Sequence, residues 1–446
     1  MSVRLREALR EAAAEVPTYP VHDRAVRTAR RTRWRTAAVV TAVLALVAAV
    51  PLTVRGDDRT APAGSGGAAL PDRLGLPPFG ALRATDRPAL GPASVVFSGQ
   101  ARGLTGLVDE NGTVGIVGAD ADRYRTWTVG FEAPAGQGVL LSPDGRFLAV
   151  PDGSATSPGV DVIDLAGGTV RRLPSPRPGS VGTGPAGWAP DGSALVVVDT
   201  TPANPERSSY VNTLSLVRLD TGRAVRLLET TQVPVFGSLA FAADGSRLAY
   251  QVGTKVLVSS PDGRQISSFP LPPDTALAGK GAWLPDGSLT LVAHEVAGDR
   301  WRLRRVDTDG RELSPPALAA VSGVTAIRLL GWLPDGSAWV VAYRPEPNAP
   351  SWYADGLAMD QRTAYANVRS IRVLSLTPGA AAPVTLLTAP DQVLAVDVAD
   401  SVVRAGRVRE ADPPSGPGGR AWWGAGLVAL ALGGLAAYRR LRRGRR

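Results

Sequence analysis

The sequence predicts an all-β fold, a six-bladed β-propeller, with a transmembrane helix on either side of it. Three observations lead to this prediction. A phrase made of a hydrophobic stretch, Asp-Gly and a second hydrophobic stretch occurs five times between residues 140 and 341. A second series of glycine turns alternates with it at a nearly constant offset. Uncharged apolar runs of 19 and 18 residues flank the repeats.

The repeated phrase has the composition of a strand, a tight turn and a second strand. Proline precedes the Asp-Gly pair in four of the five copies and presets φ to about −65°, while glycine accepts the positive φ that closes the turn. The aspartates are 47, 53, 42 and 49 residues apart, which accommodates a four-stranded blade. We interpret ten residues as structural turn formers: Asp144 and Gly145, Asp191 and Gly192, Asp244 and Gly245, Asp286 and Gly287, and Asp335 and Gly336.

The second series sets the number of blades. Its glycines precede the next aspartate of the first series by 23, 22, 23 and 25 residues, and they are Gly168, Gly222, Gly263 and Gly310. The same offset places one more turn near Ala121 and, counted forward from Gly379, another near Val402. Six turns of each kind predict six blades. A seventh blade follows if VDENGTV, near Asn111, is a turn of the first series.

One blade is expected to combine both ends of the repeat region. Its inner strand would come from residues 392–398, and its outer strands from the chain that begins near Ser94. This closure leaves no open sheet edge in the ring.

Two apolar segments outside the repeats are candidate membrane spans. Residues 36–54 and 421–438 carry no charge and are long enough to cross a hydrocarbon core of about 30 Å. Nine arginines and four acids precede the first span, and six arginines follow the second. By the positive-inside rule both tails are cytoplasmic, so the propeller lies on the extracytoplasmic side of the cytoplasmic membrane.

The predicted order of segments follows from these boundaries. A cytoplasmic head (1–35) with one short amphipathic helix precedes the first span (36–54), a Pro/Gly-rich linker (55–89) and the propeller (90–406); a second linker (407–420), the second span (421–438) and a basic tail (439–446) complete the chain. In an alternative interpretation, Arg30, Arg31 and the segment after them form a twin-arginine export signal that is removed from the mature protein.

Composition excludes several kinds of chemistry. The chain has no cysteine, which excludes disulfides, thiol catalysis and thiolate metal sites. Its two histidines, His22 and His294, are too few for a multi-histidine metal site. We therefore expect no metal, no cofactor and no catalytic residue. The tails carry +5 and +6 of a net charge of +9, so the basic character is not that of the propeller, and we expect no nucleic-acid partner.

A long loop is the candidate binding site. The segment 344–369 is expected to project from the face opposite the Asp-Gly turns, and it carries aromatic and charged side chains together: Trp352, Tyr353, Asp355, Asp360, Arg362 and Tyr365. Exposed aromatics with mixed charges suit the binding of a protein or an envelope glycan. The alternative is a lid packed over the central channel, or an insertion without a role.

Tryptophan precedes the turn in three copies, at Trp188, Trp283 and Trp332, where it is expected to pack between neighbouring blades. These W-x-PDG-S units resemble the WSPDG-type repeats of TolB-type and WD-repeat-like propellers over residues 90–406. The layout of an LREAL helix, an arginine cluster, a span and a propeller is similar to uncharacterised actinobacterial membrane proteins, some of which accompany extracytoplasmic-function sigma factors. That resemblance implies a sigma-factor regulator, although the zinc-binding His and Cys motif of many anti-sigma domains is absent.

The predicted function is that of a membrane-anchored binding or interaction module in the cell envelope. One alternative is an envelope hydrolase of glycans or esters, which needs acids, arginines or His294 to converge on one face of the channel. Another is a transmembrane sensor that signals through the cytoplasmic head.

Overall fold

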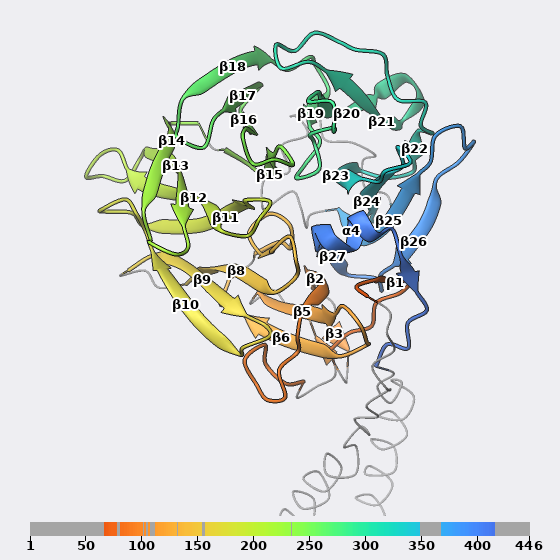
Figure 1. Ribbon diagram of the computed structural model, residues 1–446, viewed down its shortest axis with the longest axis horizontal. Helices are drawn as coiled ribbons and strands as arrows, with labels where there is room; N and C mark the ends of the chain where they lie inside the picture. The colour runs from red at the N-terminus through yellow and green to blue at the C-terminus, as the bar shows by residue number, and fades with distance from the viewer. Residues whose placement is uncertain are drawn as a thin grey trace, which may run out of the picture. The chain divides into compact units, whose positions relative to one another are not determined.

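A computed structural model describes residues 67–414, apart from short gaps at 78–80, 101, 104–105, 108–111, 132, 154–156 and 233 and the segment 348–366. Six four-stranded antiparallel sheets surround a common axis (Figure 1). The prediction of an all-β, six-bladed propeller is confirmed, and no seventh four-stranded sheet occurs in the described ranges.

Five blades consist of consecutive stretches of chain, in which the strands follow one another from the axis outward. The first contains β7 (Leu140–Leu141), β8 (Phe147–Asp152), β9 (Gly159–Asp164) and β10 (Thr169–Pro174). The second contains β11 (Gly182–Trp188), β12 (Ala194–Pro202), β13 (Tyr210–Arg218) and β14 (Ala224–Thr230). The third contains β15 (Pro234–Phe241), β16 (Leu248–Val252), β17 (Lys255–Ser259) and β18 (Gln265–Pro270). The fourth contains β19 (Thr275–Leu277), β20 (Leu289–Glu295), β21 (Arg300–Val306) and β22 (Val321–Ser322), with the short 3₁₀ helix η1 (Val296–Gly298) between β20 and β21. The fifth contains β23 (Ala326–Trp332), β24 (Ala338–Pro345), β25 (Val368–Leu376) and β26 (Val384–Thr388).

The sixth blade closes the ring with strands from both ends of the described chain. From the axis outward it contains β27 (Val393–Val398), β2 (Ala93–Gly99), β5 (Thr113–Gly118) and β6 (Tyr124–Thr128), and the short strands β3 (Arg102–Gly103) and β4 (Gly106–Leu107) pair between β2 and β5. Val95 pairs with Val398, and Phe97 with Val396. The predicted assignment of residues 392–398 to the inner strand is therefore confirmed.

The composition of a strand follows its distance from the axis. The second strand β2 (ASVVFSG) and the innermost strand β27 (VLAVDV) of the sixth blade are buried on both faces. Outermost strands face solvent, and in β10 (TVRRLP) only Leu173 is buried. Strands covered on both faces are mainly apolar, whereas a strand at the rim tolerates charge.

The Asp-Gly pairs occupy the turn between the innermost and the second strand in five blades. In the first blade, Gly145 has φ +76° and its N–H donates to the Ser142 carbonyl at 2.8 Å. The Asp144 carboxylate accepts the Arg146 N–H at 3.0 Å. Asp191, Asp244, Asp286 and Asp335 accept a serine N–H two residues ahead in the same way. The turn between the third and the outermost strand lies on the same side of each antiparallel blade, and we call this side the turn face.

The sixth blade has a helix where the others have an Asp-Gly turn. The expected turn near Val402 is replaced by α4 (Asp400–Ala405), because the second strand of this blade comes from the N-terminal side of the chain. Val402 and Val403 are the buried residues of this helix, and the Ser401 N–H donates to the Pro143 carbonyl of the first blade at 2.8 Å. Figure 1 shows α4 beside the axis of the ring.

Two of the three repeated tryptophans bond to the preceding blade. The Trp188 indole N–H donates to the Leu140 carbonyl at 3.3 Å, and that of Trp283 donates to the Ala240 carbonyl at 3.1 Å. The buried Trp332 indole nitrogen has no hydrogen-bond partner among the described residues. In its neighbouring blade the corresponding position is Ala282, whose carbonyl accepts the Thr290 N–H instead.

This difference gives a matched test of the inter-blade hydrogen bond. Trp283→Phe and Trp332→Phe remove the same atoms, but only the first removes a hydrogen bond. We expect Trp283→Phe to lower the free energy of unfolding by about 1 kcal/mol more than Trp332→Phe. Urea unfolding of the two variants measures the difference. Equal losses would show that the indole bonds contribute nothing beyond packing.

The folded unit extends on both sides of the predicted propeller boundaries, 90 and 406. Strand β1 (Leu70–Pro71) pairs in parallel with β28 (Val408–Arg409), and Asp72 accepts the Ala411 N–H at 2.9 Å. Leu70 and Leu74 are buried in the propeller core. The two stretches predicted as linkers thus meet and pair where they join the propeller, and we call this pair the terminal clasp.

In the part of the chain that the structure describes, no helix has the length and apolar character that a membrane crossing needs. The two predicted spans, 36–54 and 421–438, the head and the basic tail lie outside the described residues.

Candidate functional site

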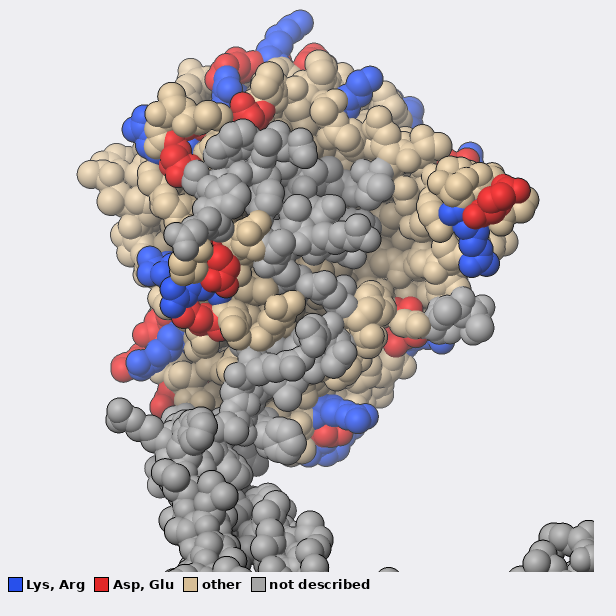
Figure 2. All heavy atoms as spheres, turned by 180° about the vertical axis from the view of Figure 1, so that it is seen from behind, with Lys and Arg blue, Asp and Glu red and all other residues tan. Residues whose placement is uncertain are grey.

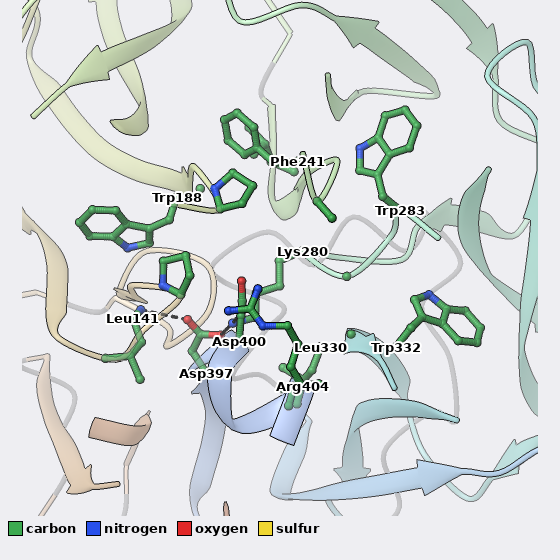
Figure 3. Close-up of a pocket in the computed structure, with 18 of the residues that line it drawn as sticks. Leu141, Trp188, Phe241, Lys280, Trp283, Leu330, Trp332, Asp397, Asp400 and Arg404 are labelled. Carbon is green, nitrogen blue, oxygen red and sulfur yellow. Dashed lines mark hydrogen bonds and ion pairs between the residues drawn. The ribbon is translucent and has the colours of Figure 1, made fainter. Parts of the chain in front are cut away.

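A cavity of about 500 Å³ opens at the axis on the turn face (Figure 3). We call it the channel-mouth cavity. All six blades contribute to its wall through the ends of their inner strands and the turns that follow, and α4 supplies the wall in the sixth blade. Its volume lies within the range of about 300–1,000 Å³ that is usual for ligand pockets.

Most of the wall is apolar, because it is built from the repeated phrase. The prolines that precede Asp-Gly line it in four blades, and Ala243 takes the same place in the third; the prolines are Pro143, Pro190, Pro285 and Pro334. Trp188, Trp283 and Trp332 also reach it, as does Phe241. The turn aspartates themselves are not part of the lining. The repeat that forms the blades thus also supplies a ring of rigid apolar side chains.

One blade departs from this regularity and brings a charge into the cavity. Between Leu277 and Trp283 the pairing of the inner strand is interrupted, and residues 278–282 form a bulge whose Ala278 carbonyl accepts the Leu329 N–H of the next blade at 2.7 Å. A Cβ on Gly279, which has φ +120°, would lie 2.9 Å from the Leu329 carbonyl oxygen. The bulge holds Lys280 at the cavity wall, and Lys280 is one of only two lysines in the chain.

Lys280 crosses the cavity to the closing strand and to α4. Its Nζ lies 2.9 Å from Asp397 Oδ1 and 2.8 Å from Asp400 Oδ1, and it donates a third hydrogen bond to the Val398 carbonyl. All three ammonium hydrogens therefore have acceptors. We call Lys280, Asp397 and Asp400 the lysine cluster; Figure 3 shows the three side chains converging at one side of the cavity.

Lys280 is held in its charged form. Burial disfavours the Lys280 ammonium, but the Asp397 and Asp400 carboxylates outweigh burial and raise the pKa of Lys280 above its ordinary value. The Asp397 side chain is 1% exposed, and its Oδ2 accepts the Leu141 N–H at 3.0 Å. The Val398 N–H donates to its Oδ1 at 3.1 Å. The Asp397 carboxylate thus accepts hydrogen bonds from Lys280 and from two backbone N–H groups, whereas the Asp400 side chain remains 37% exposed.

Arg404 is the second cation of the cavity. It lies one helical turn after Asp400 on α4 and points into the cavity (Figure 3). Acid and base four residues apart on a helix ordinarily pair. Here Asp400 bonds to Lys280 instead, and the exposed Arg404 side chain has no ion-pair or hydrogen-bond partner among the described residues. The cavity therefore presents one free guanidinium on an apolar wall.

A further arginine, Arg328, forms hydrogen bonds between elements around the axis, away from the lysine cluster. Buried Arg328 of β23 donates to the Val396 carbonyl of the closing strand and, at 3.4 Å, to the Gly136 carbonyl. Its Nε donates to the Tyr343 hydroxyl at 3.2 Å. Arg328 and Lys280 thus attach the closing strand β27 to the fifth and fourth blades.

The loop that was predicted from sequence to bind a partner begins and ends away from the channel-mouth cavity. The candidate loop residues Trp352, Tyr353, Asp355, Asp360, Arg362 and Tyr365 are outside the described residues. The strands that flank that loop place its two ends on the side of the fifth blade opposite the turn face, because β24 begins after the Asp335–Gly336 turn and runs away from it. The channel-mouth cavity is on the other side.

The turn aspartates accept hydrogen bonds from the backbone of their own turns. Backbone and side-chain hydrogen bonds from Ser246 lower the pKa of Asp244, and Ser337 does the same for Asp335. The pKa of Asp191 and of Asp286 is lowered by Ser193 and Ser288. A carboxylate that accepts such bonds is stabilised in its ionised form.

His294 does not reach the cavity. It lies near the end of β20 away from the turn face, where its Nε2 is 3.1 Å from Asp299 Oδ1 and its ring packs on Trp301 with centroids 4.8 Å apart. The side chain is 3% exposed. Its surroundings are those of a packed core residue.

Sequence reasoning missed the lysine cluster and Arg404. The only signal for Lys280 was its rarity, since Lys255 is the only other lysine. Asp397, Asp400 and Arg404 lie in VLAVDVADSVVRAG, which the sequence assigned to the closing strand and a turn. Their meeting with Lys280 depends on ring closure between residues more than a hundred positions apart.

Charged side chains outside the cavity are mixed in sign. On the face opposite that of Figure 1, the lysines and arginines lie beside aspartates and glutamates at the rim (Figure 2). Typical pairs join Arg369 to Asp391 at 2.6 Å and Arg304 to Glu312 at 2.6 Å. On this face, positive and negative side chains of the described residues therefore alternate.

Comparison with known proteins finds partial similarity to solved structures. No protein-family model matches the chain, and no curated protein matches it. Among solved structures, an oligogalacturonate lyase in complex with manganese is 15% identical with a TM-score of 0.38, over 62% of this chain and 70% of that one. The β-propeller domain of the trilobed protease from Pyrococcus furiosus is 13% identical with a TM-score of 0.32, over 54% and 68%. A TolB from Agrobacterium tumefaciens is 18% identical with a TM-score of 0.30, over 46% and 73%.

Proposed function

We propose that this chain is a binding module of the cell envelope, a propeller held at the extracytoplasmic side of the membrane by the two predicted spans. It captures a partner at the channel-mouth cavity. One observation carries the proposal: the cavity is open and mainly apolar, while Lys280 and the buried Asp397 are already paired within it. Apolar walls with a few oriented polar groups are typical of binding sites.

Filling the cavity tests this function. Ala243 is exposed and lines the mouth where the other copies have proline, so Ala243→Trp adds bulk without entering the core. Ala224→Trp, on the exposed first residue of the outermost strand β14, is the matched control. We expect Ala243→Trp to reduce capture of envelope proteins by the full-length chain at least tenfold in cross-linking experiments. Undiminished capture by this variant would place the binding surface elsewhere.

Reporter fusions test the location. Fusions after residue 34 and at the C-terminus should report cytoplasmic, and a fusion after residue 85 should report extracytoplasmic. A cytoplasmic signal from the middle fusion would contradict the proposed topology.

A second candidate function, an envelope hydrolase, has one observation in its favour. Two carboxylates, a lysine and an arginine meet in the same cavity. Hydrolysis by paired carboxylates needs both acids to reach the substrate, one as acid and one as base or nucleophile. Asp397 is buried and saturated, which leaves Asp400 as the accessible acid of the lysine cluster. Turnover of chromogenic glycosides or esters that is abolished by Asp400→Asn would favour the hydrolase over the binding module.

A further inference from the structure

We propose that the channel-mouth cavity recognises a peptide segment of a partner protein that carries both apolar and acidic side chains. The apolar side chains enter the cavity, and an acidic side chain pairs with Arg404. This inference rests on the proposed function, and it adds the chemistry of the partner.

The distribution of donors and acceptors carries the inference. Within the lysine cluster, Lys280 has no free donor, because Asp397, Asp400 and the Val398 carbonyl take all three hydrogens. Arg404 retains its five N–H donors, since its neighbour on the helix is engaged by Lys280. Arg404 itself therefore lacks an acceptor among the described residues. A carboxylate supplies two oxygens in the geometry that a guanidinium binds through a pair of parallel hydrogen bonds.

The position of Arg404 selects an acidic side chain of a passing segment. Asp397 and Lys280 lie at the buried side of the cavity, whereas Arg404 is exposed on the last turn of α4 at the mouth. A segment that crosses the mouth can insert an apolar side chain between Trp188, Trp283 and Phe241 and leave its acidic side chain at the rim. A C-terminus that entered first would instead bring its carboxylate toward the Asp397 carboxylate, which repels it.

Binding of two capped peptides isolates this contact. The probes are acetyl-Leu-Glu-Leu-amide and acetyl-Leu-Gln-Leu-amide, measured by calorimetry on the full-length chain. We expect the glutamate peptide to bind about tenfold more tightly, and Arg404→Gln to reduce this ratio to near one. Arg223→Gln is the control, because Arg223 is exposed on the same face at a turn far from the axis, and it should leave the ratio unchanged.

Charge reversal makes the test specific. Arg404→Glu should bind acetyl-Leu-Lys-Leu-amide in preference to the glutamate peptide. A ratio near one in the wild-type chain, or a ratio that survives Arg404→Gln, would overturn the inference. So would a preference for a peptide with a free C-terminal carboxylate over the capped glutamate peptide. If these peptides fail while Ala243→Trp still abolishes partner capture, the proposed function stands and only the acidic partner is rejected.

Discussion

Asp397→Asn is expected to destabilise the propeller by about 3 kcal/mol, since removing one partner of a buried ion pair leaves the other charge uncompensated. The Asp397 side chain is 1% exposed and contacts Lys280 Nζ at 2.9 Å. The substitution keeps the shape of the side chain but removes its charge, so Lys280 depends on Asp400 alone among the carboxylates. Equilibrium urea unfolding, followed by tryptophan fluorescence, measures the loss.

The control for this prediction is a surface pair of the same chemistry. Asp391 contacts Arg369 at 2.6 Å, but its side chain is 51% exposed. Asp391→Asn should therefore cost no more than about 1 kcal/mol. Pairing Asp397→Leu with Lys280→Met should restore much of the stability, because neither charge then remains buried. Equal effects of Asp397→Asn and Asp391→Asn would show that the lysine cluster does not stabilise the ring.

A chain that ends at Asp391 is expected to lose cooperative unfolding altogether. This truncation removes β27, whose Val393, Leu394, Val396 and Val398 are buried. Each such side chain contributes about 1.5–3 kcal/mol, against a total stability of about 5–15 kcal/mol for a folded domain. The truncation also leaves the inner edge of β2 unpaired, and it removes acceptors from Lys280 and Arg328.

A chain that ends at Glu410 separates closure from the loss of C-terminal residues in general. It lacks the same predicted span but keeps β27 and α4, so it should retain a single sharp unfolding transition. Adding a synthetic peptide of residues 392–406 to the shorter chain should restore part of the transition, because strand addition needs no covalent link. Cooperative unfolding of the shorter chain without this peptide would show that the ring does not depend on β27.

The number of blades could be predicted because each turn depends on residues that are close together in the sequence. Each Asp-Gly turn is specified by neighbouring residues, such as Ser142, Asp144 and Gly145, and the turn recurs at a similar spacing in five of the six blades. The closing strand could also be placed, because the regular offset between the two series of turns, counted forward from Gly379, predicts one more turn near Val402 and therefore a strand before it. The helix α4 could not, because it replaces a turn only where the chain leaves the blade instead of turning back.

The candidate site was hidden for a different reason. The segment 344–369 can be recognised from the sequence by its length and its aromatic residues, whereas Lys280 lies in a Gly-Lys-Gly stretch with no such feature. Its acceptors come from β27 and α4, more than a hundred residues later. The bulge at residues 278–282, which holds Lys280 at the cavity wall, is a local break in strand pairing next to the fifth blade. No periodicity encodes such a break.

The terminal clasp determines how the propeller would respond to a pull on its two ends. In the parallel pair of β1 and β28, the chain enters at the start of one strand and leaves at the end of the other. Opposed tension along the chain would therefore shear the clasp, loading several bonds at once: Leu70 N–H to the Arg407 carbonyl, Asp72 N–H to the Arg409 carbonyl, and Ala411 N–H to Asp72. The clasp would bear mechanical load before the seam between β27 and β2 does.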